Sequence, residues 1–252
     1  MYDAIVLAGG ENSGQLSEFS SQPYEAMIEI EGKPMVTFVT AALANTPQVD
    51  RIFVLGPAQM LEKCSFPEKV EVLEGGKTII QTIQRGMTAL GHERKTLVVT
   101  ADIPLLTSAA IEDFLSQCVE SEADLYYPIV KKELNDRYYP GNRRTYVRFT
   151  DGIYTGGNIF LVNPAIVPQC LQVAEKLIEH RKNPFQLCRI LGWGFVLQFL
   201  LGTLSIPKVK ERVAQLLGIQ GAVVHSRYPE LGIDVDKPSD LELVRSAFTC
   251  RV

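Results

Sequence analysis

The sequence contains little cysteine, and its cysteines are not arranged in pairs. Five are scattered over 252 residues without a C-x-x-C spacing: Cys64, Cys118, Cys170, Cys188 and Cys250. This is too few for a disulfide-dense scaffold in a chain of this length, and the spacing gives little support to a zinc site. We expect the cysteines to act as small buried hydrophobic residues in a reducing compartment.

The sequence also lacks an excess of positive charge. Its 25 Lys and Arg residues are outnumbered by 29 Asp and Glu residues, which gives a formal net charge of −4. That balance argues against a nucleic-acid-binding surface, so nucleic acid is not an expected partner. No basic segment precedes an apolar one at the start, so we expect no secretory signal and a cytoplasmic location. The 46% hydrophobic content excludes a disordered chain.

Long hydrophobic runs are scarce, with one exception at residues 190–206. This run has 17 residues without a charge and includes three glycines, and it falls just short of the roughly 18 residues of a membrane-spanning helix. We expect a core helix and turn without stable membrane insertion; a surface that touches lipid or a partner is the alternative. Five large side chains of the run are predicted to be buried against the apolar stripe of a preceding helix. The two sets are Trp193, Phe195, Leu197, Phe199 and Leu200, and Val167, Leu171, Ala174 and Ile178.

Short apolar runs rich in β-branched residues recur along the chain and indicate strands that are covered on both faces. They are Ala4–Leu7, Ile52–Leu55, Val70–Leu73, Leu97–Thr100 and Leu125–Val130. Between them lie apolar stripes with helical spacing, such as Ile111, Phe114, Leu115, Cys118 and Val119. This alternation predicts an α/β fold of three layers, α/β/α, with a mostly parallel, Rossmann-like sheet. Functional groups are then expected at the carboxyl ends of the strands.

The chain changes in character after residue 130. A polar stretch with six cations leads into Tyr154–Asn158, and we expect a hairpin-like excursion that returns to the sheet. Asn163 and Pro164 predict a helix start, because Asn caps helices and Pro suits the first helical position. Three helices within residues 163–220 are predicted to form an α-helical insertion near the C-terminal third. We expect residues 1–252 to form a single domain, which closes with a strand and a helix.

Three segments place candidate chemistry at the ends of strands. The first strand runs into a glycine pair whose backbone N–H groups are open to a base or a phosphate: Leu7, Ala8, Gly9 and Gly10. A later strand ends at Asp102, and the segment at 232–236 places Asp234 and Asp236 on one side of an extended chain. Mg²⁺ is typically held by one or two carboxylates plus substrate phosphates, so these three are candidate metal ligands. Each segment alone also fits a plain turn or cap.

Taken in order, these and neighbouring motifs resemble a known family. They are IVLAGG at 5–10, EGKPMV at 31–36, the glycine pair at 75–76, TADIPLLT at 100–107 and GIDVDKPSDL at 232–241. The sequence resembles the nucleotidyltransferases of the GT-A type, and within them the MobA-like group. The resemblance covers residues 1 to about 130 and 222–245 well, and the helical insertion hardly at all.

The resemblance implies a fold of the nucleotide-diphospho-sugar transferase type and a role for several residues. It implies that Asp102, with Asp234 or Asp236, binds Mg²⁺. It implies nucleotide contacts at Leu7, Ala8, Gly9, Gly10, Gly75, Gly76 and Thr78. The closing GIDVDKPSDL is similar to the end of cytidylyltransferases that act on acidic sugars.

The sequence departs from this family in the cations of the glycine loop. In the family that loop continues into an Arg and then a Lys, which hold the triphosphate and stabilise the leaving pyrophosphate. Counted back from Gly32, the lysine position holds Glu25, and no Lys or Arg occurs before Lys33. At an effective dielectric near 20, a Glu about 4 Å from a phosphate charge is unfavourable by roughly 4 kcal/mol. A phosphate at this loop would meet carboxylates instead of cations.

Cations elsewhere in the sequence are candidates for binding the substrates in place of the missing loop cations. Lys77 follows the second glycine pair, and we predict that it leans over the nucleotide and acts in catalysis. Arg144 precedes a TGGN turn, and we predict that it binds the acceptor together with Gly156, Gly157 and Asn158. Solvated surface charges and a plain turn are the alternatives.

Two functions follow from these residues and the resemblance. The first is a Mg²⁺-dependent nucleotidyltransferase, which transfers a nucleoside monophosphate from a nucleoside triphosphate to a small phosphate- or hydroxyl-bearing acceptor and releases pyrophosphate. The alternative is a catalytically degenerate protein of the same fold that binds a nucleotide or sugar nucleotide as a regulator. A glycosyltransferase is disfavoured, because the segment ending at Asp102 lacks a D-x-D pair. The base, the acceptor and the oligomeric state are left open.

Overall fold

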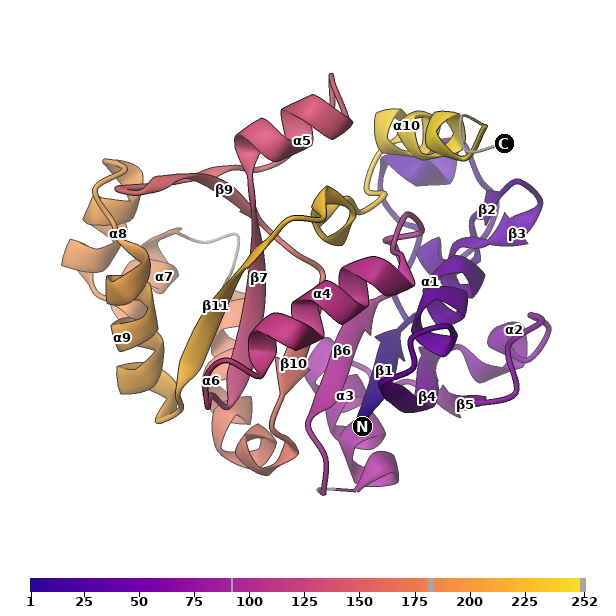
Figure 1. Cartoon of the computed structure of the whole chain (residues 1–252), viewed down its shortest axis with the longest axis horizontal. Helices are drawn as coiled ribbons and strands as arrows, with labels where there is room; N and C mark the ends of the chain where they lie inside the picture. Colours follow the sequence, from indigo (N-terminus) through magenta and orange to yellow (C-terminus); the bar gives the residue numbers. More distant parts are fainter. Residues whose placement is uncertain (92, 181–183, 250–252) are drawn as a thin grey trace.

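The structure, a computed structural model, describes residues 1–91, 93–180 and 184–249 and consists of a central sheet between layers of helices (Figure 1). The strands of this sheet follow the order β5-β4-β1-β6-β10-β7-β9-β8, with β11 beside β7. They are β1 (Tyr2–Leu7), β4 (Val49–Gly56), β5 (Val70–Glu74), β6 (Thr96–Thr100), β7 (Leu125–Lys131), β8 (Val147–Phe149), β9 (Gly152–Gly156), β10 (Ile159–Val162) and β11 (Gly221–Ser226). A separate small hairpin pairs β2 (Glu29–Ile30) with β3 (Lys33–Pro34).

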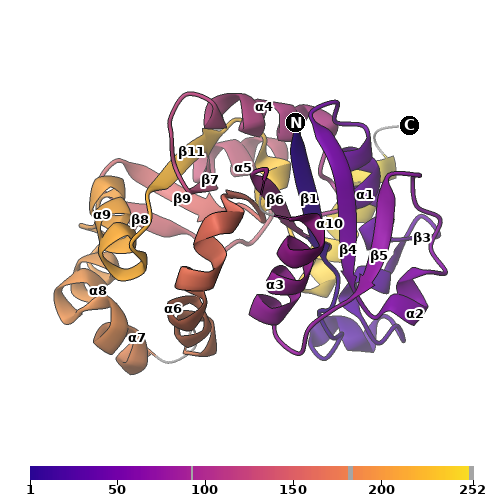
Figure 2. The same ribbon diagram turned by 90° about the horizontal axis from the view of Figure 1, so that it is seen from below.

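The helices cover both faces of the sheet (Figure 2). They are α1 (Met35–Ala44), α2 (Ala58–Leu61), α3 (Ile79–Leu90), α4 (Ser108–Cys118), α5 (Lys132–Tyr138), α6 (Val167–Glu179), α7 (Pro184–Leu191), α8 (Trp193–Leu200), α9 (Ile206–Leu217) and α10 (Pro238–Thr249). Short 3-10 helices occur at η1 (Gln15–Glu18), η2 (Glu25–Met27), η3 (Pro164–Ile166) and η4 (Pro229–Gly232).

The first half of the sheet is parallel, and the second half is mixed. Strand β1 runs parallel to β4 and β6, with Leu7 opposite Leu55 on one side and Thr100 on the other. Strand β10 lies antiparallel between β6 and β7, whereas β11 runs parallel to β7. The predicted strands and the three-layer α/β fold of the nucleotide-diphospho-sugar transferase type are confirmed.

The apolar runs of the central strands are explained by burial on both faces. Ala4 and Val6 pack on the side of the sheet covered by α1 and α4. Ile5, between them, packs on the other side with Met87 of α3 and Val167 at the start of α6. Because neighbouring residues of a strand point to opposite faces, a strand covered twice needs apolar residues at every position.

The polar stretch after residue 130 departs in part from the sequence-based expectation. The predicted hairpin is present, because β8 and β9 pair antiparallel and β9 returns to β7. Its approach is helical, since residues 132–138 form α5 before the hairpin begins.

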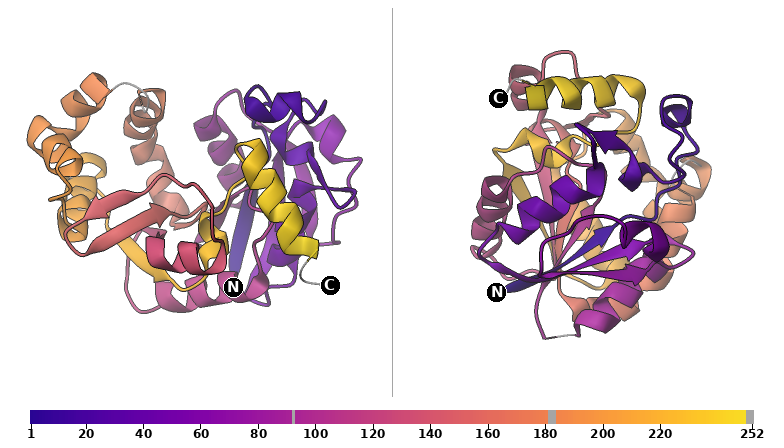
Figure 3. Two further views of the ribbon diagram at one scale, coloured as in Figure 1. Left: turned by 90° about the horizontal axis from the view of Figure 1, so that it is seen from above. Right: turned by 90° about the vertical axis from the view of Figure 1, so that its right-hand side faces the viewer.

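Helices α6, α7, α8 and α9 lie in the chain between β10 and β11. Figure 3 shows α7, α8 and α9 gathered at the end of the molecule away from α1 and α2. The expected starts of helices near Pro164, Pro184 and Pro207 agree with η3 leading into α6, with α7 and with α9. A further helix, α8, forms within the uncharged run. It is separate from α7 and α9 because Gly192 and Gly202, near its two ends, adopt positive φ angles of 92° and 66°, which interrupt a helix.

The predicted burial of the five large side chains of this run is wrong, although Leu204 and Ile206 near its end are buried. Of the five, Phe195 is half-buried. No residue of α8 is buried, and the side chains of Trp193, Leu197 and Leu200 are 63%, 57% and 73% exposed. Val167 and Leu171 of the expected partner stripe pack instead on the cluster around Ile5, so they are not available to cover α8. The side chains of Ala174 and Ile178, the rest of that stripe, are outside the described part. Among the described residues, no helix has the length and apolarity needed to cross a membrane.

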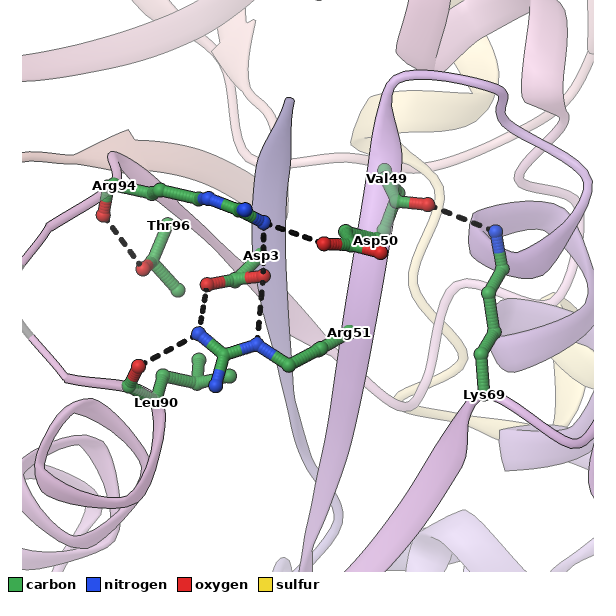
Figure 4. A network of polar contacts seen from close by, with 8 residues as sticks. All are labelled: Asp3, Val49, Asp50, Arg51, Lys69, Leu90, Arg94 and Thr96. Carbon is green, nitrogen blue, oxygen red and sulfur yellow. Dashed lines mark hydrogen bonds and ion pairs between the residues drawn. The ribbon is translucent and has the colours of Figure 1, made fainter.

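A charged network closes the amino end of the central strands (Figure 4). The Asp3 side chain on β1 is only 2% exposed, and the Nη2 atom of Arg51 lies 2.6 Å from its Oδ2 atom. The same guanidinium donates to the carbonyl of Leu90 at 2.7 Å, which links β4 to the end of α3. Arg94 lies 3.7 Å from Asp3 and 2.5 Å from the exposed Asp50. The buried carboxylate therefore ties three elements together.

Replacing Asp3 with Asn should lower the free energy of unfolding by about 1–3 kcal/mol, because a hydrogen-bonded charge pair is lost at a buried position. The matched control is Asp50→Asn, which removes a carboxylate from the exposed side of the same network and should cost clearly less, because exposed ion pairs contribute little to stability. Urea unfolding at neutral pH measures both. Equal losses in the two variants would contradict a special role for the buried carboxylate.

Candidate functional site

A cavity of about 600 Å³ opens at the carboxyl ends of β1 and β6. Segments far apart in the sequence line it: Leu7, Ala8, Gly9, Gly10, Glu11, Ser13, Gly14, Glu25, Ala26, Gly76, Lys77, Thr78, Ile79, Thr82, Thr100, Ala101, Asp102 and Asp236. The structure thus brings together the predicted nucleotide-binding residues with the single exception of Gly75, which lies just outside this lining. It also brings two of the three predicted metal ligands to the same cavity.

The backbone directly behind the lining of this cavity is closely packed. A Cβ atom placed on Gly56, at the end of β4, would lie 2.6 Å from the carbonyl oxygen of Ala8, so a side chain cannot be accommodated there. The N–H of Ala8 donates to Leu55 at 2.8 Å, and the N–H of Gly75 donates to Gly56 at 2.9 Å. The need for glycine at position 56 could not be predicted from the sequence, because it depends on how three strands meet.

The loop before α3 is held by the first turn of that helix. Thr78 caps α3 by accepting a hydrogen bond from the N–H of Gln81 at 3.2 Å. The N–H of Gly76 donates to the hydroxyl of Thr82 at 2.9 Å. A Cβ atom on Gly76 would lie 2.5 Å from that of Gln81, so this position also requires glycine. Thr78 thus has a structural role besides the predicted contact with a nucleotide.

The three predicted metal ligands come together at the edge of the cavity. One carboxylate oxygen from each of Asp102, Asp234 and Asp236 lies within 4.8 Å of the others. The N–H of Val235 donates to the carbonyl of Asp102 at 2.9 Å, which fixes the closing segment against the end of β6. The N–H of Asp236 donates to Asp240 on α10 at 3.2 Å.

The donor set of this cluster fits a hard divalent cation, since such ions prefer carboxylate oxygens. Within the described structure, the buried Oδ1 atom of Asp102 has no hydrogen-bond partner. Burial raises the pKa of the Asp102 carboxyl, and the charge of Asp236 raises it further, while Arg144 opposes the shift. Arg144 forms an ion pair with the carboxylate of Asp234 and donates to its carbonyl at 3.2 Å. Asp234 is therefore partly neutralised before any cation binds.

A second cavity of about 540 Å³ adjoins the first, with which it shares Gly14 and Asp236. Its lining contains three cations, Arg143, Arg144 and Lys237, together with Asp234, Asp236 and Asp240. Lys237 donates to the carbonyl of Arg143 at 2.8 Å, which joins the segment before β8 to the segment before α10. The lining of the second cavity is therefore richer in cations than the lining of the first.

Gly156, Gly157 and Asn158 lie outside the linings of both cavities. The N–H of Gly157 donates to Pro128 at 2.9 Å and that of Asn158 donates to Leu231 at 2.8 Å. A Cβ atom on Gly157 would lie 2.8 Å from Pro128. Close packing therefore accounts for glycine here, and the predicted contact of this turn with an acceptor stays a prediction.

Glu25 lies on the lining of the cavity, in the loop that is predicted to face phosphates. Its N–H donates to the carbonyl of Gly10 at 3.0 Å, and its Oε2 atom lies 3.2 Å from where a Cβ atom on Gly10 would be. Burial raises the pKa of Glu25 to about 7, and the charges of Asp102 and Asp236 add to the shift. Lys77, an exposed side chain, is the one cation among the described residues that line this cavity.

The fold is that of a nucleotidyltransferase domain. The family model of the MobA-like NTP transferase domain matches residues 4–189, so the chain belongs to that family.

Solved structures and curated relatives agree with this assignment. A structure described as a hypothetical transferase from Thermus thermophilus is 32% identical, with a TM-score of 0.85, and the match covers 95% of this chain and 99% of that one. A CMP:2-keto-3-deoxy-manno-octonic acid synthetase complexed with CTP shares the fold at 13% identity, with a TM-score of 0.66 and full coverage of both chains. The 2-C-methyl-D-erythritol 4-phosphate cytidylyltransferase of Gloeobacter violaceus is 21% identical over 139 residues, which are 52% of this chain and 60% of the relative. The chain thus spans less than two thirds of that curated relative.

The raised pKa of Glu25 predicts a pH-dependent stability. The folded chain holds this proton up to about pH 7, whereas the ordinary pKa is 4.5, so stability is lost as the pH rises between these values. Glu25→Gln should therefore raise the free energy of unfolding at pH 8 by about 1–2 kcal/mol, an amount reduced for partial solvent exposure. The gain should fade toward pH 5.

Urea unfolding in magnesium-free buffer at both pH values measures this difference. Glu11→Gln is the control, because Glu11 is an exposed carboxylate on the lining of the same cavity. A gain of equal size at pH 5 and pH 8 would show that the effect of the Glu25 variant does not come from ionisation.

Proposed function

We propose that this chain transfers a nucleoside monophosphate from a nucleoside triphosphate to a small acceptor and releases pyrophosphate. The observation that carries the proposal is the cavity in which the backbone of residues 8–10 and 76 faces the carboxylates of Asp102 and Asp236. In this reaction an acceptor oxygen attacks the α-phosphorus while the bond to the pyrophosphate oxygen breaks. The proposal agrees with the transferases among the relatives.

The chain's own residues would bind and orient the nucleotide. Gly9, Gly10 and Gly76 carry no side chain, so a base or a phosphate can approach the backbone closely. Asp102, Asp234 and Asp236 are the residues that would hold Mg²⁺, which when bound neutralises phosphate charge. Lys77 would add a positive charge at the rim, and Leu7, Ala8 and Thr78 complete the wall.

The second cavity is the proposed acceptor site. Arg143 and Lys237 are placed there to attract an anionic group such as a phosphate or a carboxylate. Arg144 would orient Asp234 between the two cavities through their ion pair. An acceptor bound here would lie next to Asp236, which lines both cavities, and thus close to the bound nucleotide.

A second candidate function is a nucleotide-binding protein of the same fold that does not turn over. The excess of carboxylates in the first cavity favours it, because Glu11, Glu25, Asp102 and Asp236 face a single lysine there. Phosphate binding would then depend almost entirely on a cation supplied from solution. Such a protein would bind a nucleotide or a sugar nucleotide and release no pyrophosphate.

Titration with ATP, GTP, CTP and UTP in Mg²⁺, followed by binding heat and by pyrophosphate release with a pool of acceptors, separates the two candidates. We expect one nucleotide to bind and to release pyrophosphate. Asp102→Asn should weaken Mg²⁺-dependent binding at least tenfold, with thermal stability unchanged or raised because a repelling charge is removed. Asp50→Asn, far from the cavity, should bind like the wild type.

Binding without release would support the second candidate, and binding of no nucleotide would rule out both. An Asp102→Asn variant that unfolds early but binds nucleotide as before would show that this carboxylate is a structural cap.

The position of Glu25 gives a separate test. Glu25→Lys should tighten triphosphate binding at least tenfold, because about 1.4 kcal/mol of net attraction replaces a repulsion after solvent screening. Glu62→Lys makes the same change in net charge on the exposed end of α2 and is the matched control. Calorimetry with Mg²⁺ and the nucleotide that binds best measures both. An equal gain in the control would mean that Glu25 does not face the phosphates.

A further inference from the structure

Helix α8 presents a row of large apolar side chains to solvent. Trp193, Leu197, Leu200 and Leu201 are spaced four, three and one positions apart, which places them on one face of the helix. Leu201 is 66% exposed, and Phe199 is exposed as well. We call Trp193, Leu197, Leu200 and Leu201 the α8 apolar face, because Phe199, six positions after Trp193, lies on another side of the helix. Monomeric proteins rarely leave so many large apolar side chains together in water, so this face has the character of a contact surface.

Cations border this helix along its length. At its start, Arg212 of α9 donates to the carbonyl of Ile190 at 3.2 Å. Beside its middle, Lys208 of α9 donates to the side chain of Gln198 at 2.8 Å. At its end, Arg148 of β8 packs against Gly202, where a Cβ atom would lie 2.6 Å from the arginine Cδ atom.

The surrounding sequence contains very little negative charge. Between residues 184 and 220 there are four cations, Arg189, Lys208, Lys210 and Arg212, and the one acid is Glu211. The chain as a whole carries a net charge of −4, so this segment has the opposite sign to the rest. The chemistry of the region is therefore an apolar face bordered by positive charge.

The charges decide between two occupants of this face. A second copy of the chain, paired through α8 about a two-fold axis, would place the same cations of both copies around one contact, and like charges would repel. An anionic lipid surface would instead attract those cations and accept the apolar side chains below its headgroups. Eight helical residues span about 12 Å, which is far less than the roughly 30 Å of a bilayer core. The helix would therefore lie in the plane of the interface.

We propose that the α8 apolar face docks this protein reversibly on the surface of an anionic lipid bilayer. Figures 1 and 2 place α8 at the outer end of the molecule, where it is accessible. The docking goes beyond the proposed transfer reaction and does not depend on it, because its test requires no turnover.

Sedimentation of the whole protein with vesicles tests the proposal. The vesicles consist of phosphatidylcholine alone, or of phosphatidylcholine with about one part in three of phosphatidylglycerol. We expect binding to the anionic vesicles to be at least tenfold tighter, and to weaken as salt is added. Trp193 is the only tryptophan in the chain, so its fluorescence should shift to the blue on binding.

Two variants separate the apolar and the charged contributions. Leu197→Glu with Leu200→Glu should weaken binding to anionic vesicles at least tenfold, and the fold should persist because both side chains are exposed. Lys208→Ala with Lys210→Ala should reduce the preference for anionic vesicles several-fold. Val119→Glu is the control, because Val119 is exposed at the end of α4 and should bind like the wild type.

Failure of the wild type to bind anionic vesicles would overturn the proposal, as would equal binding by the Leu197→Glu, Leu200→Glu variant. Light scattering without vesicles gives the remaining test. A dimer that forms as concentration rises, and that the same double variant abolishes, would assign the face to a second copy and would also overturn the proposal. Circular dichroism confirms that each variant is folded.

Discussion

The parallel pairing of β1 with β4 and β6 is the constraint on which the rest of the molecule depends. Because Leu7 lies opposite both Leu55 and Thr100, the three strands end at the same level. Their next residues therefore meet at one edge: the glycine loop after β1, Gly56 at the end of β4 and Asp102 after β6. Burial on both faces holds the strands in this register, since a shift by one residue reverses the side that each residue faces.

Negative charge at this edge is held in place by the fold itself. The backbone N–H of Glu25 donates to the glycine loop, and the backbone N–H of Asp236 donates to the carboxylate of Asp240. The carbonyl of Asp102 accepts a hydrogen bond from the N–H of Val235. Of Glu25, Asp102, Asp234 and Asp236, Asp234 alone forms an ion pair within the described part of the chain, with Arg144. Such an arrangement repels a triphosphate until positive charge enters with it. Binding of a polyanion and binding of a cation are therefore coupled in this cavity.

Much of the fold and part of the candidate site can be predicted from the sequence, because the signals involve residues that are close together in the chain. Continuous apolar runs such as Ala4–Leu7 identify strands covered on both faces, and Asp102 is found because it lies two positions after the end of one of them. Glu25 is found by its distance from the EGKP motif. These signals need only neighbouring residues, so one sequence is enough to detect them.

What the sequence did not predict depends on contacts between distant segments. Gly56 requires glycine only because the carbonyl of Ala8 lies against it, and Arg144 meets Asp234 from 90 positions away. The exposure of α8 is a failure of another kind. Helical spacing shows which residues share a face, but it does not show whether another element covers that face, and the expected partner residues Val167 and Leu171 pack elsewhere.

The closely packed backbone at and behind the first cavity also limits how the protein can change during evolution. Substituting Gly56 or Gly76 would force a side chain into atoms of the sheet or of α3, so these positions cannot be used to reshape the pocket gradually. The exposed side chains of Glu11 and Lys77 have no such restriction. New ligand preferences in descendants of this chain would therefore arise first at the rim, while the inner wall stays the same.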